Sequence, residues 1–260
     1  MVIKNQWIII FVALVSAPLF LQGSNTFAWQ FAAVGDIECN DTGKEIADKM
    51  IAIQGDFYIL IGDIGYGEMQ CVFDYFQGVK VFGVCGNHDE CAELEKLFGH
   101  PNTFGFIHEN VAFQLVNTET SISSQMDSIE NNFKEWQDNP NIENIVVVQH
   151  KPAVTNPTAH HPESEIEGFR DLYVDLKNNY PKFTLLLQGH NHGYQVCKPD
   201  SPNITVVTDG TGGRDPYPWG SSTDDNCNVN LSGAKYNGFS IFDVVGNEIT
   251  SKHVNLNGVE

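Results

Sequence analysis

Five short groups of polar residues carry side chains that bind metal ions, and each group follows an apolar stretch. These groups are Asp36, Gly62-Asp63, Gly86-Asn87-His88-Asp89, His150 and Gly189-His190-Asn191-His192. Carboxylate and amide oxygens suit hard cations, and imidazole nitrogen suits borderline divalent ions. Taken alone, each group has a simpler explanation, such as a carboxylate that caps a helix, a core histidine or a polar turn. The repetition of one pattern along the chain favours a single metal site.

The apolar runs before these groups have the character of buried β-strands. They read "FAAVGD", "YILIGD", "VFGVCGN", "NIVVVQH" and "LLLQGH", and continuous apolar runs bounded by turns are typical of strands covered on both faces. Helical spacing over residues 43–54, 125–138 and 165–179 separates several of them. Alternating strands and helices predict an α/β sheet, in which ligands bind at the carboxyl ends of the strands. We therefore expect the five groups to meet at one active site.

The C-terminal third of the chain has a different pattern. Residues 204–208, 238–245 and 248–256 read as strands with few helices between them, which predicts a second, more antiparallel sheet. Between them, residues 209–215 read "DGTGGRD". This segment lacks the lysine and the spacing of a P-loop, so we interpret it as a loop at the rim of the site.

In this order, the five groups resemble the motifs of the calcineurin-like metallophosphoesterases. That family has Asp, then Gly-Asp, then Gly-Asn-His-Asp/Glu, then a lone His, and finally Gly-His-x-His, and the match spans residues 36–192. The resemblance implies an α/β fold in which two mixed β-sheets pack as a sandwich flanked by helices. It also implies a dinuclear metal centre that hydrolyses phosphate esters, in a single domain over residues 29–260.

Within this family the chain is most similar to the purple acid phosphatases. Most members have a histidine two residues after the first aspartate, where this chain has Glu38. Purple acid phosphatases have instead a tyrosine three residues after the second aspartate, and Tyr66 in "GDIGY" fits this pattern. The resemblance implies a ferric ion bound by Asp36, Tyr66 and His192, a divalent Fe, Zn or Mn ion bound by Asn87, His150 and His190, and Asp63 as the bridge between them. Alternatively, Glu38 completes the first site, two divalent ions bind, and Tyr66 belongs to the wall.

The resemblance also implies roles in catalysis and in substrate binding. A metal-bound hydroxide would attack phosphorus, while Asn87 and His88 contact the phosphate. His88 would protonate the leaving group, with Asp89 or another carboxylate holding its ring. In "HHPESEIEGFR", the adjacent His160 and His161 stand where purple acid phosphatases have histidines that reach the substrate phosphate.

Residues 1–28 are expected to be a signal peptide. The apolar stretch 7–21 is shorter than the roughly 20 residues that span a bilayer, and Pro18 interrupts it. The alternative is an uncleaved N-terminal anchor. Both interpretations place the rest of the chain outside the cytoplasm, and the sequence shows no second membrane span.

All six cysteines follow the expected signal peptide, and an even number in an exported chain favours disulfide bonds. Six cysteines allow 15 connectivities. Our predicted pairs are Cys39–Cys71, Cys85–Cys91 and Cys197–Cys227. The first pair would join the loops that follow the two "GDI" motifs.

The formal net charge of −19 argues against nucleic acid as a partner, since nucleic-acid readers need a basic surface. A small phosphorylated substrate is expected instead, bound at a local cationic centre. The sequence favours a secreted phosphomonoesterase of the acid phosphatase type. A phosphodiesterase or nucleotide hydrolase with two divalent metals is the alternative within the same chemistry. A non-catalytic extracellular binding module is the alternative outside it.

Overall fold

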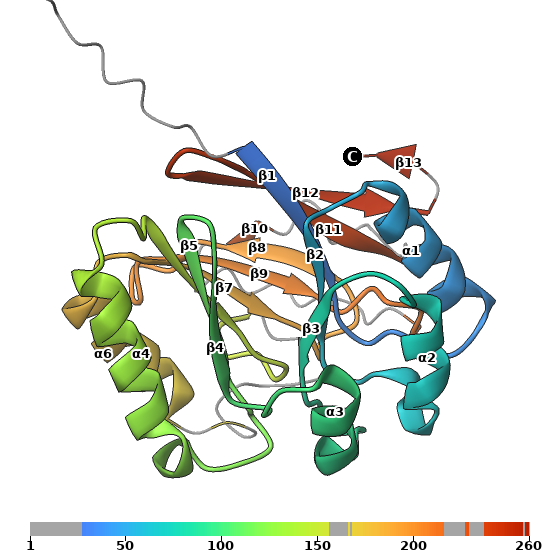
Figure 1. Ribbon diagram of the computed structural model, residues 1–260, viewed down its shortest axis with the longest axis horizontal. Coiled ribbons are helices and arrows are strands. Elements are labelled where there is room, and N and C mark those ends of the chain that lie inside the picture. The colour runs from blue at the N-terminus through green and yellow to red at the C-terminus, as the bar shows by residue number, and fades with distance from the viewer. Residues whose placement is uncertain are drawn as a thin grey trace, which may run out of the picture.

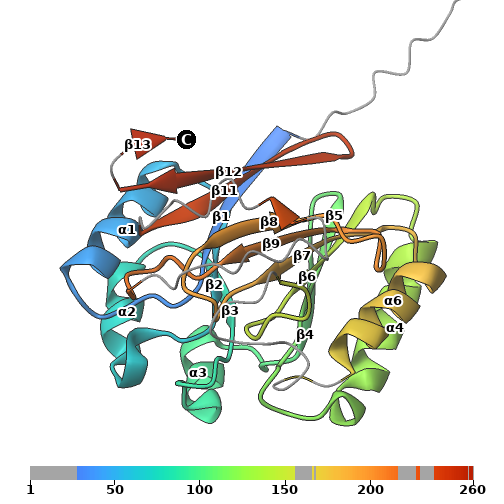
Figure 2. The same cartoon turned by 180° about the vertical axis from the view of Figure 1, so that it is seen from behind.

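Two β-sheets are stacked face to face, and helices cover both outer faces (Figure 1). The computed structural model describes residues 28–155, 166, 168–215, 227–228, 237–256 and 258–259. Helices α1, α2 and α3 lie against one sheet, and α4 and α6 lie against the other, as the view from behind also shows (Figure 2). The predicted sandwich flanked by helices is confirmed.

Five α-helices are present in the described ranges. They are α1 (Asp41–Ala52), α2 (Met69–Tyr75), α3 (Cys91–Phe98), α4 (Met126–Asp138) and α6 (Phe169–Asn179), and two short 3-10 turns lie at Gly65–Gly67 and Ile122–Ser124. The helices predicted at 43–54, 125–138 and 165–179 correspond to α1, α4 and α6. The sequence reading did not identify α2 and α3, which are only two turns long.

The first sheet has the strand order β13-β12-β11-β1-β2-β3. Its strands are β1 (Ala28–Val34), β2 (Phe57–Ile61), β3 (Val81–Val84), β11 (Gly238–Val245), β12 (Glu248–Asn255) and β13 (Gly258–Val259). Strands β1, β2 and β3 run parallel, with Ala33 opposite Ile59 and Ile59 opposite Phe82. Strand β11 joins β1 in antiparallel register.

The second sheet has the strand order β10-β8-β9-β7-β6-β5-β4. Its strands are β4 (Phe104–His108), β5 (Val111–Leu115), β6 (Asn144–Val148), β7 (Phe183–Gln188), β8 (Tyr194–Cys197), β9 (Thr205–Asp209) and β10 (Cys227–Asn228). Strands β5, β6, β7 and β9 are parallel neighbours.

This topology corrects two expectations drawn from the strand pattern. The five strands that precede the metal-binding groups do not share one sheet, because β1, β2 and β3 belong to the first and β6 and β7 to the second. The run at 204–208 also does not join the two later C-terminal runs, because β9 pairs with β7 whereas β11 and β12 extend the first sheet. A pattern of buried apolar residues identifies strands but does not specify their partners.

The space between the sheets is filled by aliphatic side chains and by a group of stacked aromatic rings. Phe31 stacks between Phe57 and Phe242, with ring centroids 5.2 and 4.7 Å away, and meets Phe113 of the opposite sheet edge-on at 5.3 Å. Stacked and edge-to-face contacts add to the free energy gained by burying these rings. Further apolar clusters lie under α1–α3 and under α4 and α6. The sandwich is therefore a stiff support for the loops at its strand ends.

The three predicted disulfides, Cys39–Cys71, Cys85–Cys91 and Cys197–Cys227, are confirmed. The first joins the loop after β1 to α2, and the second closes a loop between β3 and α3. The third links β8 to β10. Three disulfides are typical of proteins in an oxidising, extracytoplasmic environment.

The signal peptide predicted at residues 1–28 lies almost wholly outside the described residues. Among the described ranges, no helix has both the length and the apolar character that crossing a membrane requires.

Candidate metal centre

Strands of both sheets end at the candidate site. Asp36, Asp63 and Asn87 follow β1, β2 and β3 of the first sheet, and His150 and His190 follow β6 and β7 of the second. Backbone hydrogen bonds tie the loops together, since the N–H of Asp36 donates to the carbonyl of Gly62 over 3.0 Å. The candidate site therefore lies across the mouth of the sandwich, with ligands from both layers.

The backbone is left-handed at four of the predicted metal ligands. The φ angles of Asp36, Asp63, Tyr66 and His190 are 59°, 52°, 47° and 67°. Non-glycine residues seldom adopt this region, and such strain concentrates at functional sites because the surrounding structure must maintain it. At each of these positions the sharp turn lets the chain leave its strand or loop while the side chain enters the site.

Asp36, Tyr66 and His192 form one group. The Tyr66 hydroxyl donates to Oδ1 of Asp36 over 3.1 Å and lies 3.2 Å from Nε2 of His192, which is 3.3 Å from the same carboxylate oxygen. The carboxylate of Asp36 is fully buried. Three atoms that can bind a metal ion thus lie around one point.

Asp63, His150 and His190 form a second, fully buried group. Nε2 of His150 lies 3.2 Å from Oδ1 of Asp63 and 3.2 Å from Nδ1 of His190. The ligand atoms of these three residues all lie within 4.8 Å of one another. The backbone N–H of His190 donates to Oδ2 of Asp36 over 2.8 Å, so the two groups are direct neighbours.

Backbone carbonyls orient two of the imidazole rings. Nδ1 of His150 lies 2.7 Å from the carbonyl oxygen of Ile61, and Nδ1 of His192 lies 3.1 Å from that of Asp215. A carbonyl oxygen can only accept, so each Nδ1 carries a proton and each Nε2 is directed toward the centre, where it can bind a cation once it carries no proton. Metal-binding histidines are oriented in this way in proteins, and the residues present therefore fit a pair of bound metal ions.

The electrostatics of the second group depend on the close pair of Asp63 and His150. Burial works to raise the pKa of Asp63, but the nearby His150 and the hydrogen bonds outweigh it and hold the pKa far below its ordinary value. Burial works to lower the pKa of His150, but the charge of Asp63 and the hydrogen bond to it raise that pKa to about 10. The metal-free protein thus keeps a proton on His150 to balance the buried carboxylate. A bound cation would take the place of that proton.

Burial and nearby negative charges keep the Tyr66 phenol in its neutral, protonated form. Burial, and then the negative charges of Asp36 and Asp63, raise its pKa far above the ordinary value, while the positive charge of Arg214 acts in the opposite direction. The phenol therefore stays protonated unless a cation lies beside it.

Two glycines are required by the close approach of the loops. A Cβ on Gly62 would lie 2.5 Å from Nδ1 of His150, and one on Gly86 would lie 2.2 Å from Oδ1 of Asp63. Both distances are shorter than real contacts, so a side chain at either position would displace a candidate ligand. Gly62 therefore leaves room for the His150 ring, and Gly86 leaves room for the Asp63 carboxylate.

The loop that carries Asn87, His88 and Asp89 differs in part from expectation. The side chains of Asn87 and His88 are exposed; the His88 ring lies 5.0 Å from that of Tyr66, and its Nε2 lies 4.0 Å from Oδ2 of Asp63. The backbone N–H of His88 donates to Oδ1 of Asp63 over 2.9 Å. His88 thus lies at the mouth of the centre.

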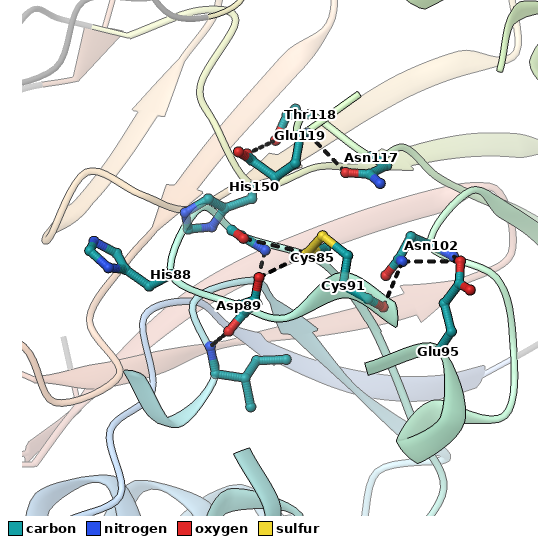
Figure 3. The surroundings of a disulfide bond; sticks show 12 residues. Cys85, His88, Asp89, Cys91, Glu95, Asn102, Asn117, Thr118, Glu119 and His150 are labelled. Atoms are coloured by element: carbon teal, nitrogen blue, oxygen red, sulfur yellow. Dashed lines mark hydrogen bonds between the residues drawn. A yellow bond between two sulfur atoms is a disulfide. The ribbon is translucent and has the colours of Figure 1, made fainter. Parts of the chain in front are cut away.

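Asp89 does not hold the His88 ring. Its carboxylate accepts from the backbone N–H groups of Ile64 and Gly86, over 2.7 and 2.8 Å, and Figure 3 shows the His88 ring turned away from it. Burial raises the pKa of Asp89 to about 7. Asp89 therefore joins the loop after β2 to the loop after β3, and the carboxylate closest to Nε2 of His88 in the described contacts belongs to Asp63.

Glu38, the alternative ligand, is engaged outside the two groups. Its carboxylate accepts from the guanidinium of Arg214 and from the side-chain amide of Asn40. The guanidinium carbon lies 4.3 Å above the Tyr66 ring. The described contacts therefore place Tyr66, rather than Glu38, against Asp36 and His192.

His160 and His161 lie outside the described residues, so their contact with substrate stays a prediction. Arg170, on the same stretch of sequence, lies on α6 and donates to the carbonyl of Ser201 over 3.0 Å.

Sequence reasoning underestimated the segment 209–215. A Cβ on Gly210 would lie 2.7 Å from Oδ2 of Asp36, and the Asp215 carbonyl orients His192. Behind it is a buried polar network, in which Asp209 accepts from the hydroxyls of Thr211 and Ser240. The three glycines in "DGTGGRD" were the available signal, because they permit this close packing.

Comparison with known proteins agrees with this geometry. The family model of the calcineurin-like phosphoesterases matches residues 30–194. No curated protein sequence matches the chain. Among solved structures, the chain is similar to GAP50, the anchor in the inner membrane complex of Plasmodium, at 15% identity and a TM-score of 0.64, over 90% of this chain and 86% of that one.

A dimetal phosphatase from Danio rerio is similar at 12% identity and a TM-score of 0.53, over 86% of this chain and 98% of that one. Identities this low show the fold alone. The family model covers more than half of the sequence and includes both ligand groups. The chain therefore belongs to the calcineurin-like phosphoesterase family.

Proposed function

We propose that the protein is a secreted phosphomonoesterase with an Fe(III)–M(II) centre, where M is Fe, Zn or Mn. Family membership implies metal-dependent hydrolysis of phosphate esters. The observation that carries the finer proposal is the contact of the Tyr66 hydroxyl with Asp36 and His192. Hard anionic oxygens suit a trivalent ion, and imidazoles with an amide suit a divalent one.

Each group of residues has a role in this proposal. Asp36, Tyr66 and His192 would hold the ferric ion, Asn87, His150 and His190 would hold the divalent ion, and Asp63 would contribute to both. When bound, the two cations supply positive charge for the phosphate and activate a water molecule. Asn87 would turn inward from its exposed position to reach its ion.

His88 is proposed to donate a proton from Nε2 to the departing alkoxide. Its exposed ring at the mouth can reach a leaving group, and Asp63 lies 4.0 Å from the same nitrogen. Asn87 and His88 are also proposed to contact the phosphate, together with His160 and His161. The formal net charge of −19 makes nucleic acid an unfavourable substrate.

Rates on p-nitrophenyl phosphate and on bis(p-nitrophenyl) phosphate test the reaction class. We expect the metal-loaded protein to prefer the monoester. A preference for the bis-ester would instead support a phosphodiesterase with two divalent ions. The fold also occurs in a protein described as an anchor, so a non-catalytic binding module becomes the better account if neither ester is hydrolysed.

Tyr66→Phe tests the ferric site directly. The iron-loaded wild type should be violet, because a phenolate bound to Fe(III) gives a charge-transfer band in the visible range, and the variant should lose that band. The phenyl ring keeps the packing against Arg214 and His88, so the fold is retained. A colourless wild type that contains iron would contradict the assignment, and Glu38→Gln should leave the colour in place.

A further inference from the structure

The segment 209–215 contacts every side chain of the proposed ferric site. Gly210 packs on Asp36, the carbonyl of Asp215 orients His192, and Arg214 lies over Tyr66. The first two contacts explain how the site is built. Arg214 brings a permanent positive charge to the edge of the site.

Arg214 is held both at its backbone and at its guanidinium. Its backbone belongs to a loop that pairs with the loop after β1: Gly212 donates to the carbonyl of Gly35 over 3.0 Å, Glu38 donates to that of Gly212 over 3.1 Å, and Ile37 forms a bridge with Gly213. Its guanidinium donates to Glu38, which also accepts from Asn40 at the start of α1. The orientation of the guanidinium is therefore set before any substrate binds.

The guanidinium is also accessible. The side chain of Arg214 is 42% exposed, and that of Glu38 is 20% exposed. An ion pair this exposed contributes little to stability, so an arriving anion can share the donors at small cost. A guanidinium forms paired hydrogen bonds with carboxylate and phosphate groups, which suits it to anion recognition.

The position of Arg214 indicates which part of a substrate it meets. The guanidinium carbon lies over the face of the Tyr66 ring rather than at the phenol oxygen, so one side chain separates it from the cluster of ligand atoms. The His88 ring, which marks the leaving-group side, contacts the same tyrosine. Arg214 therefore lies outside the ligand atoms that would hold the transferred phosphate, and an anion bound to it would belong to another part of the substrate.

From this placement we propose that Arg214, oriented by Glu38, binds a second anionic group on the leaving part of the substrate. The inference rests on the proposed function and makes it narrower: the preferred substrates are phosphate esters that carry a further carboxylate or phosphate.

The test uses two substrates of similar size, 3-phosphoglycerate and glycerol 3-phosphate, of which only the first has a carboxylate. Release of phosphate by the metal-loaded full chain gives kcat and KM for each. Arg214→Gln should lower kcat/KM about ten- to hundredfold for 3-phosphoglycerate, mainly through KM, as expected when charge-assisted hydrogen bonds are lost. The loss for glycerol 3-phosphate should be less than about threefold on the same reasoning.

Three further variants sharpen the result. Arg214→Lys keeps the charge but not the paired donors, so it should recover only part of the preference. Glu38→Gln should weaken the preference while the arginine remains. Lys252→Gln removes a surface charge that pairs with Asp243 on the strands β12 and β11, and should change neither ratio.

Different results would contradict the inference about Arg214 and the proposed function. Equal losses on both substrates in Arg214→Gln would overturn the inference and leave the phosphatase intact. Failure of the wild type to hydrolyse either substrate, or p-nitrophenyl phosphate, would overturn the proposed function and this inference with it.

Discussion

Asp63→Asn should remove most of the activity while the protein remains folded. Asparagine has the same shape, and its Oδ1 can still accept from the N–H of His88. The amide lacks the charge that Asp63 contributes between the two ligand groups, and the proton that balances it on His150 is no longer favoured. We expect metal content to fall and kcat to decrease at least about 10²- to 10³-fold, the effect of losing one electrostatic group in an active site.

Metal analysis by mass spectrometry and phosphate-release rates measure this outcome, and thermal unfolding reports on the fold. Asp243→Asn is a matched control, since that carboxylate is exposed on β11 and pairs with Lys252. Full metal content together with full activity in Asp63→Asn would contradict the assignment of the site.

His88→Ala should slow the hydrolysis of esters with poor leaving groups far more than that of activated esters. An alkoxide needs a proton as it departs, whereas p-nitrophenolate leaves without one. General-acid catalysis contributes about 10²–10⁴-fold, so we expect a loss of about 10²-fold or more on an alkyl phosphate. On p-nitrophenyl phosphate the loss should be about tenfold or less on the same basis.

His88→Asn serves as a second variant, because it keeps a polar side chain but cannot donate from an acidic group. It should show the same dependence on the leaving group. His108→Ala is the control histidine: His108 pairs with Asp56 and packs on Trp29, away from both ligand groups. Equal losses of His88→Ala on both kinds of ester would argue against the role as an acid.

The sequence was sufficient to identify the strands that end at the site. The run "YILI" before Gly62-Asp63 is apolar on every residue because β2 is covered on both faces, and it ends where the chain turns into the centre. The motif order then identified all six side chains that the structure brings into the two ligand groups. The three predicted disulfide pairs are also present, but the motifs supplied a reason only for Cys39–Cys71, which joins the loops after the two "GDI" motifs.

Other features depend on contacts that no local pattern encodes. The division of the strands between two sheets depends on which edges pair, and apolar runs look alike in both. Asp89 was expected to hold a histidine ring, but its oxygens bond to backbone N–H groups, which every residue type except proline has. Arg214 reaches Tyr66 from more than a hundred residues away in the sequence, so only the three-dimensional structure shows their contact.

The disulfides Cys39–Cys71 and Cys85–Cys91 have a consequence for how the centre gains its ions. The first holds the loop after Asp36 to the helix after Tyr66, and the second closes the loop that contains Asn87, His88 and Asp89. These crosslinks restrict the loops whether or not a cation is bound, so most of the ordering entropy is lost during folding. The apoprotein should consequently survive chelation as a folded molecule and accept iron or zinc again without refolding.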